Sequence, residues 1–255
     1  MRNHKVHVEE IWGTVVTIDV ALFRTNADVV QSAIDEVIQW LKDVDVVFST
    51  YKKDSVINQL REGRITLDEI DAGVADVISR CTSLKEITEG NFDPWAVPGG
   101  FDPSGIVKGW AADRATDILL EHGVHDFMIN AGGDVTVRGY AEQSMLWSIG
   151  IAHPYMHGEI CESIQITQGA VATSGRYERG DHIVSPHGLP IGCASATVVG
   201  PDAAVADAMA TALLITGQAG FQWIAQMPGY SAHIVEGDRT YSYGPAFPEK
   251  VASGQ

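Results

Sequence analysis

Apolar and polar residues alternate through residues 5–23, which is the pattern of a β-strand with one buried face. Gly13 interrupts the alternation and predicts a bend between two strand segments. From Asn26 onward the period changes to that of a helix, with Thr25 or Asn26 as the N-cap. The apolar face of this helix consists of Val30, Ile34, Val37 and Leu41. A strand pair followed by a long amphipathic helix is therefore expected at the start of the chain.

Further helices, separated by one long loop, are expected in the rest of the first half. A short helix should start at Asp54, and a longer one should run over residues 68–88 and be closed by Gly90. Residues 91–109 are dense in glycine and proline and are expected to form a loop. A helix over residues 110–121 should follow.

The second half is expected to consist mainly of strands. The turn AGGD between two apolar runs predicts a hairpin over residues 126–139. Further strands are expected over residues 147–152, 164–167, 171–173, 196–199, 231–237 and 240–244, and helices over residues 202–216 and 221–226. Because no linker or repeat divides the chain, we expect one α+β domain over residues 1–255, with residues 240–255 as a strand end and a polar tail.

The composition indicates a packed protein with a strongly negative charge. Of the 255 residues, 45% are apolar, which is enough for a hydrophobic core. The 33 acidic residues outnumber the 17 basic residues and give a formal charge of −16. A field of this sign disfavours nucleic acid and anionic membranes as partners. The charge of an anionic ligand would have to be neutralised locally, by a metal ion or by a few hydrogen-bond donors at the binding site.

The cysteines and the apolar segments bear on the compartment. The chain has an odd number of cysteines and no Cys-x-x-Cys pair; the cysteines are Cys81, Cys161 and Cys193. Neither a disulfide framework nor a thiolate zinc site is therefore expected. The first residues lack the apolar stretch of a signal peptide, and no later stretch reaches the roughly 18 apolar residues of a membrane span. We expect a cytoplasmic protein without membrane insertion.

Tyr51 lies in the segment FSTYKKDSVIN, residues 48–58, between the end of one predicted helix and the start of the next. An exposed aromatic ring at this place would stack on a flat ligand ring. A tyrosine that covers the helix junction is the more ordinary interpretation of the same residues.

The segment GNFDPWAVPGGFDPSGIVKGWAAD, residues 90–113, is the second candidate. A glycine-rich loop that runs into a helix lets backbone groups approach phosphates, and Lys108 would add a positive charge. The spacing matches neither a P-loop nor GxGxxG. A turn before an ordinary helix explains the segment equally well.

His182 lies in the segment TSGRYERGDHIVSPHG, residues 173–188, on a short apolar run between polar turns. A histidine in this setting would act as a general acid or base, although a structural or solvated histidine is the commoner case. His153 and His157 have the i, i+4 spacing of metal ligands. Pro154 and Gly158 break the helix that this spacing requires, so we expect loop residues there.

Asp207 and Thr211 are four residues apart on a helix of small apolar residues, so they share one face. A buried carboxylate and a buried hydroxyl are costly unless they are paired, and two oxygens suit a hard cation such as Mg²⁺. The alternative is structural: Asp207 would cap or pair near the helix start, and Thr211 would bond back to a carbonyl. The spacing leaves both interpretations open.

In this order the segments resemble the ApbE family, the FAD:protein FMN transferases. The resemblance covers nearly the whole chain, and seven motifs carry it: WGT at 12–14, FSTY and DSVIN within 48–58, GNFDP at 90–94, FDPSGIVKGWAAD at 101–113, NAGGDVTVRG at 130–139, TSGRYERGDHIVSP at 173–186 and ADAMATALLITG at 206–217. It implies a single ApbE-like, T-fold-related α+β domain in which mixed or antiparallel sheets pack against helices.

The resemblance also implies roles for individual residues. Tyr51 takes the position of the aromatic residue that stacks on the flavin, and a tyrosine there is typical of transferases, whereas an asparagine accompanies relatives that hydrolyse FAD. Lys108 would assist at the phosphates, and His182 matches the histidine proposed as the base. The other positions of the FAD site are Trp12, Asn91, Phe92, Asp93, Asp102 and Ile183. The metal ligands would be the side chains of Asp207 and Thr211 and the backbone carbonyl of Gly105.

The chain departs from the family pattern around these positions. It is a short form, because a longer insertion is usual between the first FDP motif and FDPSG. Trp95 stands where a small hydroxyl residue is usual, and the sequence Pro186-His187-Gly188 replaces Pro-Arg-Thr-Gly. These differences concern the residues that would hold the adenosine and the pyrophosphate.

The activity implied by the resemblance is Mg²⁺-dependent transfer of FMN from FAD to a Thr or Ser hydroxyl of a client flavoprotein, with release of AMP. Two alternatives stay open. A Mg²⁺-dependent FAD pyrophosphatase would use water in place of the protein hydroxyl, and Tyr51 argues against it. A non-catalytic FAD-binding protein would use the same pocket without turnover.

Overall fold

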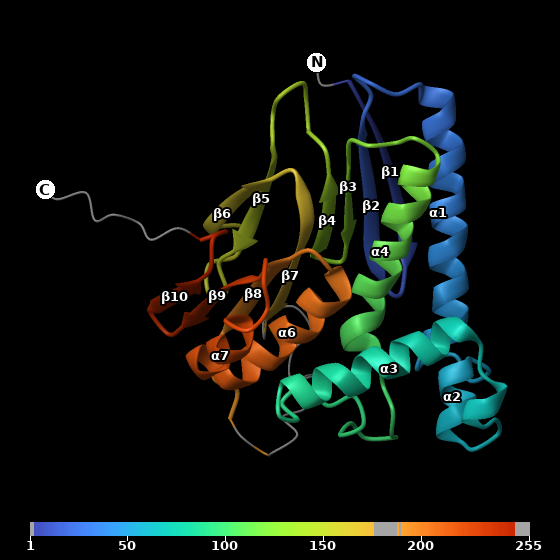
Figure 1. Ribbon diagram of the computed structural model, residues 1–255, viewed down its shortest axis with the longest axis vertical. Coiled ribbons are helices and arrows are strands. Elements are labelled where there is room, and N and C mark those ends of the chain that lie inside the picture. Colours follow the sequence, from blue (N-terminus) through green and yellow to red (C-terminus); the bar gives the residue numbers. More distant parts are fainter. Residues whose placement is uncertain (1–2, 176–187, 189, 248–255) are drawn as a thin grey trace, which may run out of the picture.

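Eight strands form one antiparallel sheet in the computed structural model, which describes residues 3–175, 188 and 190–247 (Figure 1). Their order across the sheet is β1-β2-β3-β4-β7-β8-β9-β10. The bounds are β1 His4–Ile11, β2 Thr14–Ala21, β3 Phe127–Ala131, β4 Asp134–Arg138, β7 Gln168–Gly175, β8 Ser195–Gly200, β9 Ser231–Glu236 and β10 Arg239–Tyr243. The α+β class and the antiparallel sheet expected from the sequence are thereby confirmed.

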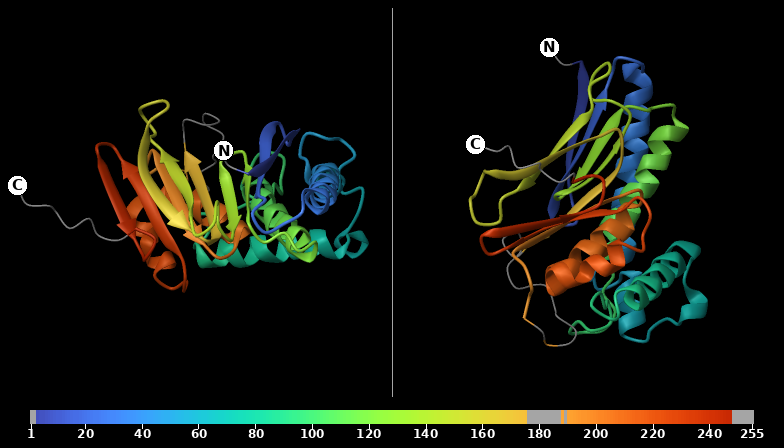
Figure 2. Two further views of the ribbon diagram at one scale, coloured as in Figure 1. Left: turned by 90° about the horizontal axis from the view of Figure 1, so that it is seen from above. Right: turned by 60° about the vertical axis from the view of Figure 1, so that its left-hand side comes forward.

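Three helices cover one face of this sheet: α1 (Ala27–Phe48), α4 (Ser104–Glu121) and α6 (Ala203–Thr216) (Figure 2). The core lies between the helices and the sheet. The apolar face predicted for the first helix is part of it, since Val30, Ile34, Val37 and Leu41 are all buried. Asn26 caps α1 as predicted, because its side chain accepts a hydrogen bond from the backbone N–H of Asp28.

A two-stranded hairpin of β5 (Trp147–Ala152) and β6 (Ile160–Ile166) covers part of the opposite face. Side chains of β4 and β7 alternate between the two faces, so Val135, Val137 and Val171 form a second core with Trp147 and Ile149 of the hairpin. The centre of the large sheet is therefore buried on both faces.

The remaining helices lie near the lower end of α4 in Figure 1 or follow α6. They are α2 (Val56–Arg61), the 3₁₀ turn η1 (Leu67–Glu69), α3 (Ala72–Ile87), the 3₁₀ turn η2 (Gly217–Gly220) and α7 (Phe221–Ile224). The helix expected over residues 68–88 is shorter than predicted. Asp71 caps α3 by accepting from the N–H of Val74, and Thr66 and Glu69 form a separate capping box before it.

The loop expected over residues 91–109 is wrong in its second part, because α4 begins at Ser104. Asp102 accepts a hydrogen bond from the N–H of Ser104 at 3.0 Å, and Pro103 precedes the first turn. Gly105, Lys108 and Gly109 are consequently helical residues. Gly109 serves helix packing, whereas Gly99 and Gly100 lie in the loop before α4 with positive φ angles.

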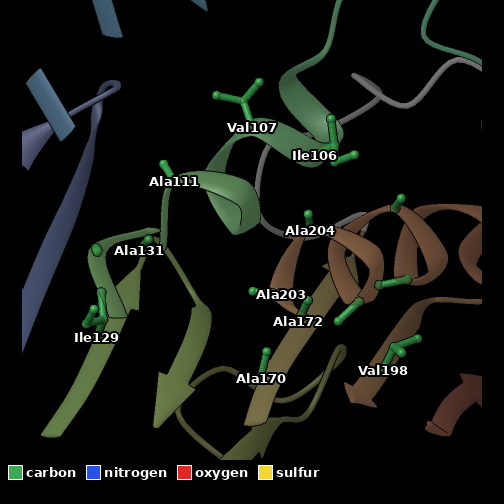
Figure 3. Packing of buried hydrophobic residues seen from close by; sticks show 14 of the residues in the cluster. Ile106, Val107, Ala111, Ile129, Ala131, Ala170, Ala172, Val198, Ala203 and Ala204 are labelled. Atoms are coloured by element: carbon green, nitrogen blue, oxygen red, sulfur yellow. The ribbon is translucent and has the colours of Figure 1, made fainter. Parts of the chain in front are cut away.

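Gly109 is the point of closest approach between α4 and α6. A Cβ atom at this position would lie 2.3 Å from the carbonyl oxygen of Ala203. Figure 3 shows the small side chains Ala203 and Ala204 of α6 beside α4 and above the strand of Ala170 and Ala172. Small residues on both elements thus let the two helices approach closely over the sheet.

The apolar character of α6 reflects this burial. Residues Ala203–Ile224 form the one helical stretch of the described chain that is long and apolar enough to cross a membrane, and 67% of it is buried inside the protein. A helix buried in a protein core meets the same criteria of length and apolar composition.

We predict that Gly109→Ala destabilises the protein by about 2 kcal/mol or more, because the added methyl group collides with the backbone of Ala203. The matched control is Gly73→Ala in α3, where the nearest atom to the new Cβ lies at 3.3 Å on the Asp71 side chain. Its free energy of unfolding should change by at most about 1 kcal/mol. Urea unfolding of both variants provides the measurement, and equal effects would contradict the close-contact argument.

Candidate functional site

Hydrogen bonds from α4 fix the first turn of α6. The carboxylate of Asp113 on α4 accepts from the backbone N–H groups of Ala203, at 3.0 and 3.1 Å, and of Ala204, at 3.3 Å. Asp202 accepts from the N–H of Val205 and is the N-cap residue itself. Together with the Gly109 contact, these bonds set both the distance and the rotation of α6 relative to α4.

Burial, and to a smaller extent the negative charge of Asp202, raises the pKa of Asp113 from 3.8 to about 7. The N–H groups of Ala203 and Ala204 and the guanidinium of Arg80 lower it and oppose this shift. The helix contact is therefore sensitive to protonation of one carboxyl group.

The fixed contact brings Lys108 of α4 between two buried carboxylates. Its ammonium group forms an ion pair with Asp134, the first residue of β4, and lies 3.5 Å from Oδ2 of Asp207 on α6. Asp134 and Asp207 are only 7% and 5% exposed, respectively. The other oxygen of Asp134 accepts from the N–H of Thr173 on β7 at 3.3 Å. Among the described residues, one ammonium thus lies between two buried carboxylates.

The residues predicted to bind a metal lie together at this place. Asp207 and Thr211 are one turn apart on α6, and the hydroxyl of Thr211 lies 3.1 Å from that of Ser174 on β7. A Cβ atom at Gly105 would lie 3.9 Å from Oγ1 of Thr211 and 3.1 Å from the ring of Phe92. The purely structural alternative is wrong in its details, because Asp202 caps α6 and the hydroxyl of Thr211 bonds to Ser174.

The donor set at this place suits a hard cation. Among residues 3–175, 188 and 190–247, no group of three or more His, Cys, Asp or Glu residues could hold a metal ion. A cation would depend on the carboxylate of Asp207, the hydroxyl of Thr211 and the carbonyl of Gly105. Oxygen donors of these kinds are the ligands that Mg²⁺ takes in proteins.

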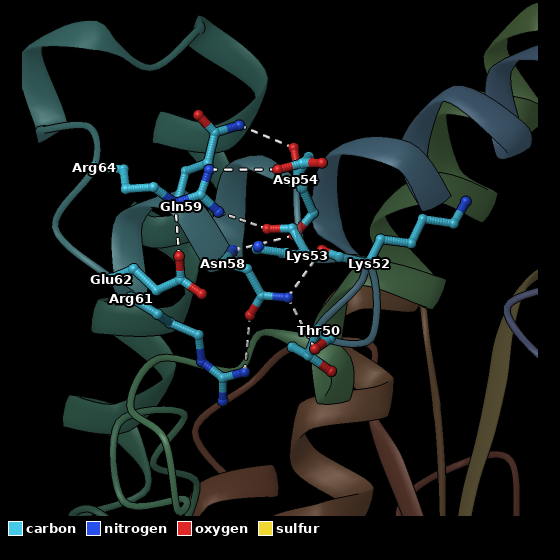
Figure 4. Close-up of polar contacts among 10 residues, drawn as sticks. Thr50, Lys52, Lys53, Asp54, Asn58, Gln59, Arg61, Glu62 and Arg64 are labelled. Carbon is cyan, nitrogen blue, oxygen red and sulfur yellow. Dashed lines mark hydrogen bonds and ion pairs between the residues drawn. The ribbon is translucent and has the colours of Figure 1, made fainter.

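Tyr51 is 98% exposed, so the interpretation that it covers the helix junction is wrong. The turn that carries it is nevertheless fixed, as Figure 4 shows. The amide of Asn58 donates to the carbonyls of Thr50 and Lys52, on either side of Tyr51, at 2.9 Å each. Arg61 donates to Oδ1 of Asn58 and to the carbonyl of Gly100, both at 3.3 Å. An exposed ring on a fixed turn can stack on a planar ligand at little entropic cost.

The residues of the predicted FAD site that precede α4 have partly local roles. Phe92 is buried, and its N–H donates to the hydroxyl of Thr88. Asp93 pairs with Lys85 at 2.7 Å, and Asp102 accepts from Ser104 at the start of α4. Trp95, a departure from the family pattern, stacks against Phe101 at a centroid distance of 4.9 Å. Local contacts therefore define the conformation of this segment.

Two predicted FAD-site residues carry buried polar atoms without a partner in the described structure. They are Nε1 of Trp12 and Oδ1 of Asn91. Trp12 also has a positive φ of 60° at the turn between β1 and β2, an uncommon conformation for a bulky residue. Unsatisfied buried polar atoms and backbone strain are both frequent at ligand sites.

The remaining predictions concern residues outside the α4–α6 contact and the turn of Tyr51. His182 and Ile183 lie outside the described residues, so their roles stay predictions. His153 lies in the loop between β5 and β6, where its Nδ1 is within hydrogen-bonding distance of the N–H groups of Tyr155 and Met156. Of the three cysteines, Cys81 and Cys193 are buried and Cys161 is half-buried.

Sequence reasoning missed Asp134, Asp113, Asn58 and Arg61. Asp134 was interpreted only as the end of the AGGD turn. A usable indication was present, because an acidic residue at the start of the apolar strand DVTV needs a partner once the strand is buried.

A family model described as the ApbE family matches residues 12–99 and 98–234. A protein named FAD:protein FMN transferase from Vibrio cholerae is 32% identical over 151 residues, which cover 54% of this chain and 45% of that relative. A protein of the same name from Haemophilus influenzae is 24% identical over a match that covers 79% of this chain and 77% of that relative. The match to the Vibrio relative thus spans less than half of that protein.

Solved structures agree in fold. The flavin transferase ApbE from Vibrio cholerae superposes with a TM-score of 0.83 at 21% identity, over 94% of this chain and 97% of that one. The ApbE protein from Thermotoga maritima reaches a TM-score of 0.79 at 25% identity, over 91% and 94% of the two chains. The arrangement of sheet and helices is therefore that of these proteins.

The raised pKa of Asp113 predicts how stability depends on pH. The folded protein retains a proton that the unfolded chain releases between about pH 4 and 7, so stability is lost as pH rises through this range. Asp113→Asn keeps the shape and an acceptor oxygen but does not titrate. Between pH 5 and pH 8 the wild type should lose on the order of 2 kcal/mol more than this variant. Urea unfolding at both pH values tests this, and parallel profiles would contradict it.

Proposed function

The chain belongs to the ApbE family, and we propose that it is an FAD:protein FMN transferase. In this proposal it moves FMN from FAD to a Thr or Ser hydroxyl of a client flavoprotein, with release of AMP and with Mg²⁺ as the metal. The observation that carries the proposal is the meeting of Lys108, Asp207, Thr211 and Gly105 at the α4–α6 contact. The names of the curated relatives support the same activity.

The charge of the protein explains why such a cluster is needed. FAD carries an anionic diphosphate, and a chain with a formal charge of −16 repels it at long range. Bound at Asp207, Thr211 and the carbonyl of Gly105, Mg²⁺ would neutralise the diphosphate and the charge that develops during transfer. Lys108 would donate hydrogen bonds to the phosphate oxygens as a second positive charge.

The reaction balances as a phosphoryl-type substitution. The hydroxyl oxygen of the acceptor residue forms a bond to the FMN-side phosphorus, and the bond from that phosphorus to the bridging oxygen breaks. AMP leaves with the bridging oxygen. His182 would take the proton of the attacking hydroxyl, a contribution of typically about 10²–10⁴ in rate. Tyr51 would hold the isoalloxazine ring from the exposed turn.

Two alternative functions would use the same groups, and one assay distinguishes them from the proposed transfer. The purified chain is incubated with FAD, Mg²⁺ and a candidate flavoprotein that offers an exposed Thr or Ser. A fluorescent acceptor band with a mass increase of one FMN supports the proposal. Free FMN with AMP would indicate a pyrophosphatase, and unchanged FAD would indicate a binding protein without turnover.

Asp207→Ala should reduce Mg²⁺-stimulated turnover by about 10²-fold or more, because the charged cation ligand is lost. The matched control is Asp238→Ala, which removes an exposed carboxylate in the turn between β9 and β10. This control should retain full turnover. Circular dichroism checks that both variants fold. Wild-type activity in Asp207→Ala would contradict the assignment of Asp207 as a metal ligand.

Asn58→Ala should weaken FAD binding roughly fivefold, because the turn of Tyr51 loses the two hydrogen bonds that the Asn58 amide donates to it and must be ordered by the ligand. The control is Gln59→Ala, which removes a 2.9 Å bond to the carbonyl of Asp54 in the same segment. Its affinity should stay at the wild-type value. Titration of FAD followed by flavin fluorescence measures both, and equal affinities in the two variants would contradict the role of Asn58.

A further inference from the structure

Lys108 is shared unequally by the two carboxylates that flank it. Its ammonium is in direct contact with Oδ2 of Asp134 but lies 3.5 Å from Oδ2 of Asp207. The Lys108 side chain is 19% exposed, and those of Asp134 and Asp207 are 8% and 7% exposed. Water therefore screens the interactions among these three groups only weakly.

Asp134 is itself fixed by the sheet. The ladder between β4 and β7 includes the pair Val135 and Val171, and Thr173 lies beyond it on β7. The N–H of Thr173 donates to Oδ1 of Asp134 at 3.3 Å, which leaves Oδ2 directed at Lys108. The carboxylate that contacts the ammonium more closely is thus held by backbone, and Lys108 is the flexible partner.

An ammonium and a divalent cation compete for the same carboxylate. If Lys108 moved fully onto Asp207, its positive charge would occupy the place next to the oxygen that the proposed cation needs. The site can hold both only if another negative charge draws the ammonium to one side. Asp134 lies on that side, at the start of β4 rather than on α6.

We propose that Asp134 is a positioning residue that holds Lys108 away from Asp207 and thereby keeps the ammonium from competing with the divalent cation for the Asp207 carboxylate. The proposal rests on the cation site of the proposed function. It assigns to Asp134 a role in cation affinity although it is not a cation ligand.

Mn²⁺ binding without FAD tests this role, with electron paramagnetic resonance of the unbound ion as the readout. Asp134→Asn keeps the shape and an acceptor for Thr173 but removes the charge. Lys108 then shifts onto Asp207, and the Mn²⁺ affinity should fall on the order of tenfold. Adding Lys108→Met removes the competing charge at similar length, so the double variant should return to within about threefold of the wild type.

The control for net charge is Glu9→Gln, which breaks the 2.6 Å ion pair of Glu9 with Lys42 between β1 and α1. Its Mn²⁺ affinity should equal that of the wild type. An Asp134→Asn variant with wild-type affinity, or a double variant as weak as Asp134→Asn, would overturn the positioning role. The variant Asp207→Asn distinguishes failure of the positioning role from failure of the proposed cation site. This variant should no longer bind Mn²⁺, and Mn²⁺ binding that persists in it would overturn the cation site and the positioning role together.

Discussion

The contact between α4 and α6 determines the geometry on which the candidate site depends. Gly109 allows the backbone of Ala203 to approach, and Asp113 accepts the first N–H groups of α6. Neither residue contributes an atom to the site. Together they set the distance between the helix that carries Gly105 and Lys108 and the helix that carries Asp207 and Thr211. Helices whose backbones touch have little freedom to slide, so the donor groups are positioned before a ligand arrives.

The same contact concentrates charge where water is scarce. Asp113, Asp134 and Asp207 belong to the buried or nearly buried part of a chain with a formal charge of −16. Asp113 accepts hydrogen bonds from the helix N–H groups, whereas Asp134 and Asp207 both lie beside the ammonium of Lys108. Carboxylates in a site of low exposure favour the entry of a divalent cation and, with it, of an anionic dinucleotide.

Local patterns in the sequence predicted most of the elements, because periodic burial and caps such as Asn26 depend on neighbouring residues alone. The start of α4 was mispredicted, since Gly109 is explained by a helix almost a hundred residues away in the chain. The spacing of Asp207 and Thr211 predicted an oxygen pair, but only the sheet order reveals Asp134 as the partner of Lys108. The role of His182, the extent of the domain over residues 1–255 and the cytoplasmic location stay predictions.

A crystal structure of the chain with FAD and Mn²⁺, with the ion located by its anomalous signal, tests the central claim most directly. The account predicts the ion within about 2.2 Å of a carboxylate oxygen of Asp207 and of the Thr211 hydroxyl, in contact with the diphosphate of FAD and with Lys108 still paired to Asp134. An ion bound elsewhere, or FAD bound while the ammonium of Lys108 bridges Asp207 and the diphosphate in place of the metal, would contradict it.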